Sequence, residues 1–181
     1  MVNLMKKILF LLLLLFIFPL SVFSYDFNIN SNNVILINLN EDKILYEKNS
    51  DSKTYIASLT KIMTAVVALE NIDDLNTKVL LTTEDFKDIY KYDLQKSGLR
   101  VNNSYTYEEL LYALLISSGA DAASCLARNV GGSVSNFVKM MNDKAKELNL
   151  NNTKFANPIG YDDINNLSLI HISEPTRPEP I

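Results

Sequence analysis

A serine and a lysine three residues apart, Ser58 and Lys61, are the side chains of this sequence best suited to covalent chemistry. They stand at the start of an apolar stretch, residues 57–69, that is typical of a helix, on which residues three apart share one face. A serine hydroxyl is a weak nucleophile unless a neighbouring base takes its proton. A lysine is that base only when its pKa is lowered enough for the neutral amine to form. The pattern therefore predicts a Ser-x-x-Lys acylation site.

Two other stretches bear on this prediction. A second copy of the pattern, from Ser50 to Lys53, is polar and has no apolar helix behind it, so we interpret it as a solvated turn. Because the pattern is short, it is informative only together with partner motifs. Ser118 lies in a Ser-Ser-Gly break between two helical stretches, where a second hydroxyl could enter the same cleft and relay a proton. The alternative is an ordinary turn between helices.

Strands and helices are mixed around these residues. Two strand-like runs, residues 33–39 and 43–47, are separated by a polar Asn-Glu-Asp connection and predict an antiparallel hairpin. Thr106 and Glu109 have the spacing of a capping box, which predicts a helix start. Further predicted elements are a helix from Ser58, a strand at 79–81, a helix start at Thr83, a loop at 97–103, a helix at 121–130 and a helix capped by Ser133.

The first residues predict a secretory signal. Lys6 and Lys7 precede an unbroken apolar run, Ile8–Leu20, and small residues follow up to Ser24. A charged start, a short apolar stretch and small residues are the parts of a cleaved leader. We therefore predict that residues 1–24 are a signal peptide and that the protein is exported to the cell envelope. The run is short for a membrane span, so an uncleaved anchor is the weaker alternative.

Charge and cysteine content narrow the classes of partner. The chain has 17 basic and 21 acidic residues, and the leader holds two of the lysines and no acid, so the remainder has a net charge of 15 − 21 = −6. An acidic exported protein has no electrostatic attraction for nucleic acid. Cys125 is the only cysteine, so no internal disulfide can form, and its apolar surroundings favour a core position over a reactive thiol.

The carboxyl end differs from the rest of the sequence. The eleven residues from Leu167 to Arg177 resemble the translation of a transposase adapter used in sequencing libraries. We therefore predict that residues 167–181 are a tail that is not native to the protein, and we exclude them from the predicted fold. One consequence concerns His171, the only histidine: it is not recruited into a Ser-His-Asp triad, so the base must be another residue.

Four passages together resemble one family. They are residues 35–49, the run Ala-Ser-Leu-Thr-Lys-Ile-Met-Thr at 57–64, residues 107–123, and residues 137–163 with a Met-Asn pair and an Asn-Pro-Ile-Gly-Tyr-Asp-Asp turn. The sequence is similar to the serine D-alanyl-D-alanine carboxypeptidases, the low-molecular-weight penicillin-binding proteins of bacterial cell walls. The resemblance covers residues 33–166. Residues 25–166 are then predicted to be the N-terminal part of a catalytic domain.

The resemblance implies a β-lactamase/transpeptidase-like fold of the α/β (α+β) class, in which helices flank an antiparallel sheet with the site at its edge. It implies Ser58 as the acylated nucleophile, Lys61 as its base and Ser118 as the serine of a Ser-x-Asn motif, with no cofactor and no metal. Ala120 stands where that motif has a substrate-binding asparagine, and alanine cannot make the hydrogen bonds of an amide. The implied substrate is a peptidoglycan stem peptide ending in D-Ala-D-Ala, β-lactam antibiotics are the implied inhibitors, and the outer face of the cytoplasmic membrane is an implied location.

A larger departure is that the sequence lacks the family's Lys-Thr-Gly motif, whose strand supplies a cation for the substrate carboxylate and one N–H of the oxyanion hole. Loss of one oxyanion donor costs on the order of 10²–10³ in rate. The strands that would pair with the first hairpin are missing too, which leaves an open sheet edge. We therefore expect an interrupted fragment, incomplete at the C-terminus, that is poorly soluble and inactive.

Two other functions remain as alternatives. A serine β-lactamase shares the first motif and the fold, and Glu147 with Asn151 has a spacing that could suit its deacylating water. We interpret Glu147 instead as a solvated helix end. A non-catalytic envelope protein that binds penicillin or peptidoglycan is favoured by Ala120 and by the missing third motif. Covalent labelling of Ser58 by a fluorescent penicillin separates an enzyme from an inert module, and hydrolysis of penicillin at a useful rate would indicate the β-lactamase.

Overall fold

The computed structural model describes residues 29–161, 163 and 166–168. The chain divides into two compact units, Met1–Ser31 and Asn32–Ile181, and the described helices and strands all belong to the second. The predicted signal peptide at 1–24 lies outside the described residues, as does the predicted tail beyond its first two residues. Both remain predictions.

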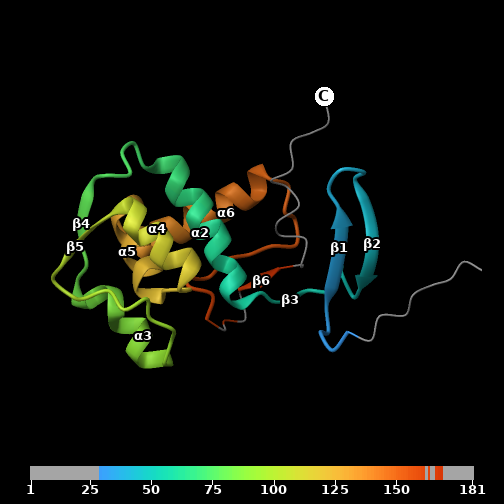
Figure 1. The fold of residues 1–181 in the computed structure, drawn as a ribbon, viewed down its shortest axis with the longest axis horizontal. Coiled ribbons are helices and arrows are strands. Elements are labelled where there is room, and N and C mark those ends of the chain that lie inside the picture. The colour runs from blue at the N-terminus through green and yellow to red at the C-terminus, as the bar shows by residue number, and fades with distance from the viewer. Residues whose placement is uncertain (1–28, 162, 164–165, 169–181) are drawn as a thin grey trace, which may run out of the picture. The chain divides into compact units, whose positions relative to one another are not determined.

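The helices of the second unit pack around α2 (Thr60–Asn71), which begins two residues after Ser58. It contacts α4, α5 and α6 (Figure 1), and Val67 and Ala68 are among its fully buried side chains. Burial on several sides explains why this stretch is apolar almost throughout. None of the helices in the described ranges is long and apolar enough to cross a membrane. The remaining helices are α3 (Lys87–Tyr92), α4 (Tyr107–Ile116), α5 (Ala120–Gly131) and α6 (Val134–Glu147), and the 3₁₀ turns are η1 (Ala57–Leu59) and η2 (Thr83–Phe86).

The described strands all pair antiparallel, in three two-stranded sheets. The predicted hairpin is present as β1 (Val34–Asn38) and β2 (Lys43–Lys48). Helices together with antiparallel strands confirm the predicted α+β class, although the strands lie in separate pairs where the resemblance implied one sheet. The other pairs are β4 (Lys78–Leu80) with β5 (Ser104–Thr106), and β3 (Thr54–Tyr55) with β6 (Leu167–Ser168).

Strand β6 consists of the first two residues of the predicted tail. Leu167 pairs with Tyr55 and also bridges to Lys154, and the Ser168 hydroxyl lies 2.6 Å from Thr153 Oγ1. Main-chain pairing uses groups that every residue other than proline carries. The strand therefore does not distinguish native from added sequence, and the boundary after residue 166 stays a prediction.

Local capping signals in the sequence locate most helix starts. Thr106 and Glu109 form the predicted capping box, with Thr106 Oγ1 accepting from the Glu109 N–H at 3.1 Å. Ser133 caps α6 as predicted, accepting from the Asn136 N–H. The start predicted at Thr83 is confirmed as the first residue of η2, and the residue before it is the cap, because the Asp85 carboxylate accepts from the N–H and hydroxyl of Thr82. The three-residue spacing of Thr82 and Asp85 is the capping-box signal.

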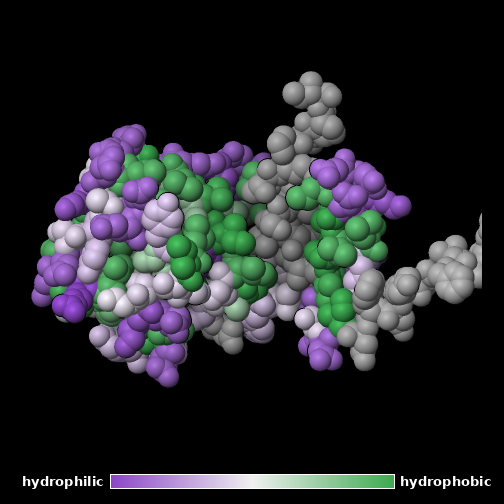
Figure 2. Space-filling model, in the orientation of Figure 1, coloured by the Kyte–Doolittle hydropathy of each residue, from purple (hydrophilic) through white to green (hydrophobic). Residues whose placement is uncertain are grey.

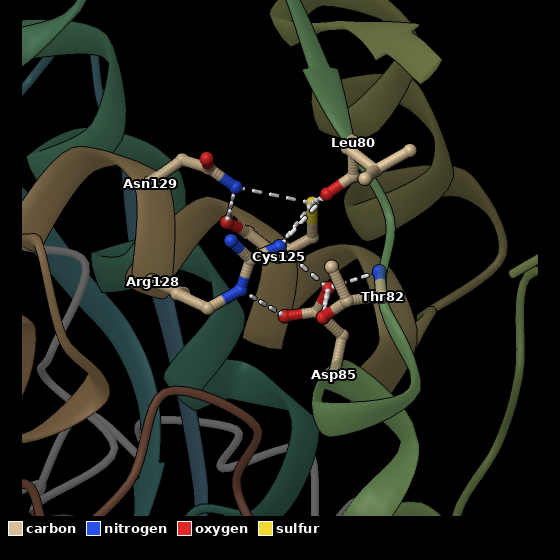
Figure 3. A network of polar contacts seen from close by, with 6 residues as sticks. All are labelled: Leu80, Thr82, Asp85, Cys125, Arg128 and Asn129. Atoms are coloured by element: carbon tan, nitrogen blue, oxygen red, sulfur yellow. Dashed lines mark hydrogen bonds and ion pairs between the residues drawn. The ribbon is translucent and has the colours of Figure 1, made fainter. Parts of the chain in front are cut away.

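An ion pair between a buried carboxylate and a half-buried guanidinium connects η2 to α5 (Figure 3). Arg128 donates from Nε and Nη2 to the two carboxylate oxygens of Asp85, each at 2.8 Å, and Nη2 also donates to the Leu80 carbonyl. Thr82 donates to the same carboxylate from the other side. Cys125 lies beside this network, fully buried as its apolar surroundings predicted. Burial raises the pKa of its thiol to about 12, which makes it a poor nucleophile.

Apolar side chains also reach the surface. Leu36, Ile44 and Leu45 of the hairpin are about half exposed, and Leu115 and Ile116 near the end of α4 are exposed as well. Figure 2 shows apolar surface on the hairpin and over α2. Apolar side chains that gather on a surface are typical of faces that contact other protein or a ligand.

Candidate active site

Ser58 lies in the 3₁₀ turn η1, directly before α2, and its side chain is exposed. The preceding residue, Ala57, has a positive φ of 45°, which is uncommon for a residue with a Cβ. The N–H of Thr60 donates to carbonyls of this turn, so η1 and α2 form one continuous element. Residues three apart are eclipsed in a 3₁₀ turn. The predicted proximity of Ser58 and Lys61 is thus realised by a tighter turn than the expected α-helix.

Three polar side chains lie close together at the amino end of α2. Lys61 Nζ lies 3.4 Å from Ser58 Oγ, and Ser118 Oγ lies 3.0 Å from the same oxygen. Ser118 comes from the turn between α4 and α5 and has a left-handed backbone, with φ of 53°. The structure therefore brings together the three residues to which the sequence assigns nucleophile, base and relay. Their catalytic roles stay predictions.

Lys61 is 5% exposed, although it carries an ionisable amine. Burial lowers its pKa from 10.5 to about 8, because removing the ammonium from water disfavours the charged form. Its amine donates to the main-chain oxygen of Ile159 at 2.6 Å, a contact between residues 98 apart in the sequence. A lysine with this pKa supplies a substantial fraction of neutral amine near neutral pH, which is the requirement for a base.

The Ile159 carbonyl is placed by a tight turn, Asn157–Gly160. Asn157 is 3% exposed, and its Oδ1 accepts from the N–H groups of Ile159 and Gly160. Thr64 on α2 donates to the Pro158 carbonyl at 2.7 Å. Gly160 has φ of +89°, and a Cβ there would lie 2.0 Å from the Ala57 carbonyl oxygen, so only glycine fits. The turn is therefore packed directly against the Ser58 turn and α2.

The Ser118 turn has its own support from the loop after α3. Asp121, fully buried at the start of α5, accepts from the N–H and the hydroxyl of Ser97. Gly119 lies between them, and a Cβ on it would lie 2.6 Å from Ser97 Cβ. The Ala120 N–H donates to the Gln95 carbonyl at 2.9 Å. These contacts fix the backbone on which Ser118 is carried.

A hollow of about 410 Å³ opens beside Ser58. Its walls are apolar apart from the three polar residues. Ala120 is not part of the lining and is 1% exposed, so the structure does not bring the predicted substrate-binding position into this hollow. The lining residues are Ile56, Ala57, Ser58, Leu59, Lys61, Ile62, Leu114, Leu115 and Ser118.

The competing sequence features lie elsewhere. Glu147 ends α6, pairs with Lys144 at 2.8 Å and has a side chain that is 66% exposed, as its interpretation as a solvated helix end predicted. The second Ser-x-x-Lys copy is a turn, as predicted. The prediction that this turn is solvated holds only in part. Ser50 itself is buried and its hydroxyl donates to Glu47, whereas Lys53 is exposed. Across the described ranges, no group of three or more His, Cys, Asp or Glu side chains is arranged to hold a metal.

Comparison with known proteins places these features in a family. Residues 21–172 match the D-alanyl-D-alanine carboxypeptidase family. The chain is 37% identical over 126 residues to the D-alanyl-D-alanine carboxypeptidase DacF of Bacillus subtilis, covering 70% of this chain and 32% of that protein. It is 34% identical over 137 residues to a D-alanyl-D-alanine endopeptidase of Escherichia coli, covering 74% of this chain and 42% of that protein.

The fold is also found among solved structures. The crystal structure of a DD-transpeptidase from Streptomyces superposes with a TM-score of 0.71 at 32% identity, over 75% of this chain and 54% of that one. The chain thus spans between a third and about half of the length of the proteins it matches. The transpeptidase-like fold predicted from the sequence is confirmed. On the strength of the family match over residues 21–172, the chain belongs to the D-alanyl-D-alanine carboxypeptidase family.

Proposed function

We propose that this protein is a serine-type D-alanyl-D-alanine carboxypeptidase that removes the terminal D-alanine from peptidoglycan stem peptides. The observation that carries the proposal is the cluster of Ser58, Lys61 and Ser118. In this cluster a buried amine of pKa about 8 lies 3.4 Å from a hydroxyl at the amino end of a helix. A nucleophile within reach of a base, and a base held by a third group, are the parts of a covalent acyl-transfer site.

The reaction proceeds in two steps. Neutral Lys61 takes the proton of the Ser58 hydroxyl as Oγ bonds to the carbonyl carbon between the two D-alanines. The C–N bond then breaks, and the proton passes to the departing D-alanine amine through Lys61 or the Ser118 hydroxyl, which lies 3.0 Å from Ser58 Oγ. Water hydrolyses the acyl-Ser58 ester in the second step. The amino end of α2 favours the negative charge that develops near Ser58 in both steps.

Relatives named as a carboxypeptidase, an endopeptidase and a transpeptidase share this part of the chain. A single acyl-serine can serve all three reactions, because they differ in the amine that leaves or in the acceptor that attacks the ester. We favour the carboxypeptidase because the family match carries that description. A β-lactamase is not favoured: among the described residues, the hollow beside Ser58 has no carboxylate in its lining to activate a deacylating water.

Export and inhibition follow as parts of the same proposal. The charged start and apolar run of residues 1–24 support secretion to the cell envelope, where peptidoglycan is found. A β-lactam carries a strained amide that the same serine can open. We therefore infer that β-lactams acylate Ser58 and inhibit the enzyme. We also infer that the enzyme acts at the outer face of the cytoplasmic membrane.

The test uses the complete protein, because the 181-residue chain alone is expected to be inactive. It is labelled with a fluorescent penicillin and assayed for release of D-alanine from a peptide ending in D-Ala-D-Ala. Ser58→Ala should abolish both signals. Ser50→Ala is the matched control, because Ser50 begins the other Ser-x-x-Lys copy and should leave both signals unchanged. Penicillin bound at a residue other than Ser58 would contradict the assignment. Labelling without D-alanine release would favour the non-catalytic binding protein, and rapid penicillin hydrolysis would favour the β-lactamase.

A further inference from the structure

The amine of Lys61 must be held in one orientation to work as a base. A buried turn, Asn157–Gly160, holds it through a hydrogen bond. We propose that Asn157 is a positioning residue: its side chain folds the turn Asn157–Gly160 so that the Ile159 carbonyl holds the Lys61 amine beside Ser58. The inference rests on the proposed function for its catalytic meaning. The geometry on which it stands is the 2.6 Å contact from Lys61 Nζ to Ile159 O and the amide network behind it.

The chemistry of a carbonyl explains why this contact orients a base. A neutral amine has two N–H donors and one lone pair, and only the lone pair can receive the Ser58 proton. A carbonyl oxygen accepts hydrogen bonds and never donates. When Ile159 O accepts one N–H, the lone pair is left free to face Ser58 Oγ, which is 3.4 Å from Nζ. A hydroxyl in place of the carbonyl could donate to the lone pair and block it.

Asn157 fixes the position of that carbonyl through three contacts. Its Oδ1 accepts from Ile159 N at 3.1 Å and from Gly160 N at 2.6 Å, and its Nδ2 donates to the Tyr161 carbonyl at 3.2 Å. The side chain is 3% exposed, so water does not replace these bonds readily when the amide is removed. Asn157 touches no reacting atom in this arrangement. Its effect passes through the backbone of Ile159.

Thr64 holds the same turn from the side of α2. Its hydroxyl is fully buried and donates to the Pro158 carbonyl at 2.7 Å, one residue before Ile159. Asn157 and Thr64 therefore hold the two peptide groups that flank the Ile159 α-carbon. Since Thr64 lies one helical turn beyond Lys61 in sequence, α2 carries both the base and an anchor for the group that orients it.

The groups around Lys61 determine whether its pKa rises or falls when the turn is loosened. Burial is the one cause of its lowered pKa, and no other titratable side chain of the described residues lines the hollow beside it. On the side of the turn, the next titratable groups along the described chain are Lys154 before it and Tyr161 and Asp163 after it. Loosening the turn would admit water to the amine and relieve the desolvation. The pKa of Lys61 would then rise toward its ordinary value.

The experiment uses the whole protein and two measurements on each variant. The titration midpoint of Lys61 is followed by the NMR signal of its ¹³C-labelled ε-carbon, and acylation by a fluorescent penicillin is timed across pH. The variants are Asn157→Ala and Thr64→Val, with Thr64→Ser as the conservative replacement that keeps the hydroxyl. Asn142→Ala is the matched control, because Asn142 also bonds the backbone of this segment, but its hydrogen bonds go to Val138 and Phe155, outside the turn behind Lys61.

We expect Asn157→Ala to raise the Lys61 midpoint by at least one unit, which makes the neutral fraction and the acylation rate about tenfold smaller at pH 7. Thr64→Val should act in the same direction, Thr64→Ser should restore the midpoint, and Asn142→Ala should lower only the melting temperature. A midpoint within 0.3 units of the wild-type midpoint in both Asn157→Ala and Thr64→Val would overturn the inference. If the wild-type protein is not acylated, the proposed function fails, but the NMR midpoints still decide the role of Asn157.

Discussion

Two cations of this protein, the buried Lys61 and the half-buried Arg128, have opposite electrostatic surroundings. Arg128 pairs with both oxygens of Asp85, and this hydrogen bonding raises its pKa further above its already high value. Lys61 contacts only a carbonyl and a hydroxyl, and burial lowers its pKa to about 8. A carboxylate partner stabilises the charged form, whereas neutral acceptors compensate only part of the lost hydration.

The difference separates a cation that stabilises the fold, Arg128, from one that can act as a base, Lys61. The Asp85–Arg128 pair joins η2 to α5, and the carboxylate favours the charged form of the guanidinium (Figure 3). Lys61 is held by neutral groups and can lose its proton near neutral pH, as a base must. A carboxylate beside Lys61 would have stabilised the ammonium and removed the base. The neutrality of the turn behind Lys61 is therefore as important as its shape.

The largest expected effect comes from making Lys61 resemble Arg128. Lys61→Arg keeps the charge but replaces the amine with a guanidinium that cannot be deprotonated. Acylation by a fluorescent penicillin should fall by roughly 10²–10⁴, the usual contribution of a general base. Lys61→Met is the companion variant, since it removes base and charge together and should lose as much. An arginine variant that acylates at the normal rate would show that Lys61 acts as a fixed cation.

The next effect is on stability and comes from removing the partner of Asp85. Arg128→Met leaves a carboxylate whose side chain is 1% exposed with only the Thr82 hydrogen bonds. Breaking a buried ion pair in this way costs about 3–5 kcal/mol. Urea unfolding should show this loss, while the acylation rate per folded molecule stays unchanged. Combining Arg128→Met with Asp85→Asn should recover part of the stability, because the unpaired charge is then removed.

The sequence predicted the part of the site that local spacing determines. Ser58 and Lys61 are three residues apart, and any helical turn places them together, so the 3₁₀ geometry of η1 changed little. Thr106 and Ser133 were recognisable as caps because their partners lie three residues away. Ser118 was identified through its family resemblance, since a Ser-Gly turn between helices has no function of its own.

The remainder of the site depends on long-range contacts that residue types do not reveal. Lys61 is oriented by a main-chain carbonyl, which every residue has, and Ile159 is 98 positions away. The Asn-Pro and Gly of that turn were visible as turn formers, but their target was not. Likewise, nothing local indicates that Asp121 holds Ser97 or that Ala120 is absent from the lining of the hollow. These contacts become visible only in the folded structure, where segments distant in the sequence pack together.

A third prediction concerns pH. Below about pH 8 the neutral fraction of Lys61 rises tenfold per unit, so the acylation rate constant should rise with the same slope and level off above that pH.

The free energy of unfolding should also rise with pH. Between about pH 8 and 10.5 the unfolded chain binds more protons at Lys61 than the folded one, so its contribution to the unfolding free energy rises with pH. Lys61→Met should remove that contribution. A flat rate profile from pH 6 to 9 would contradict the assignment of the base.

The smallest expected effect concerns Cys125, the neutral neighbour of the Arg128 pair. Burial, and then the negative charge of Asp85, raise the pKa of its thiol to about 12, so the reactive thiolate is on the order of 10⁻⁴ of the total at pH 8. Alkylation by iodoacetamide in the native protein should therefore proceed only through unfolded molecules. Because Arg128→Met raises the unfolded population, it should accelerate alkylation by the same factor by which it increases the unfolding constant. If alkylation accelerated more than unfolding does, the thiol would be reached by a local opening between η2 and α5. The ion pair would then hold that contact closed in addition to stabilising the whole fold.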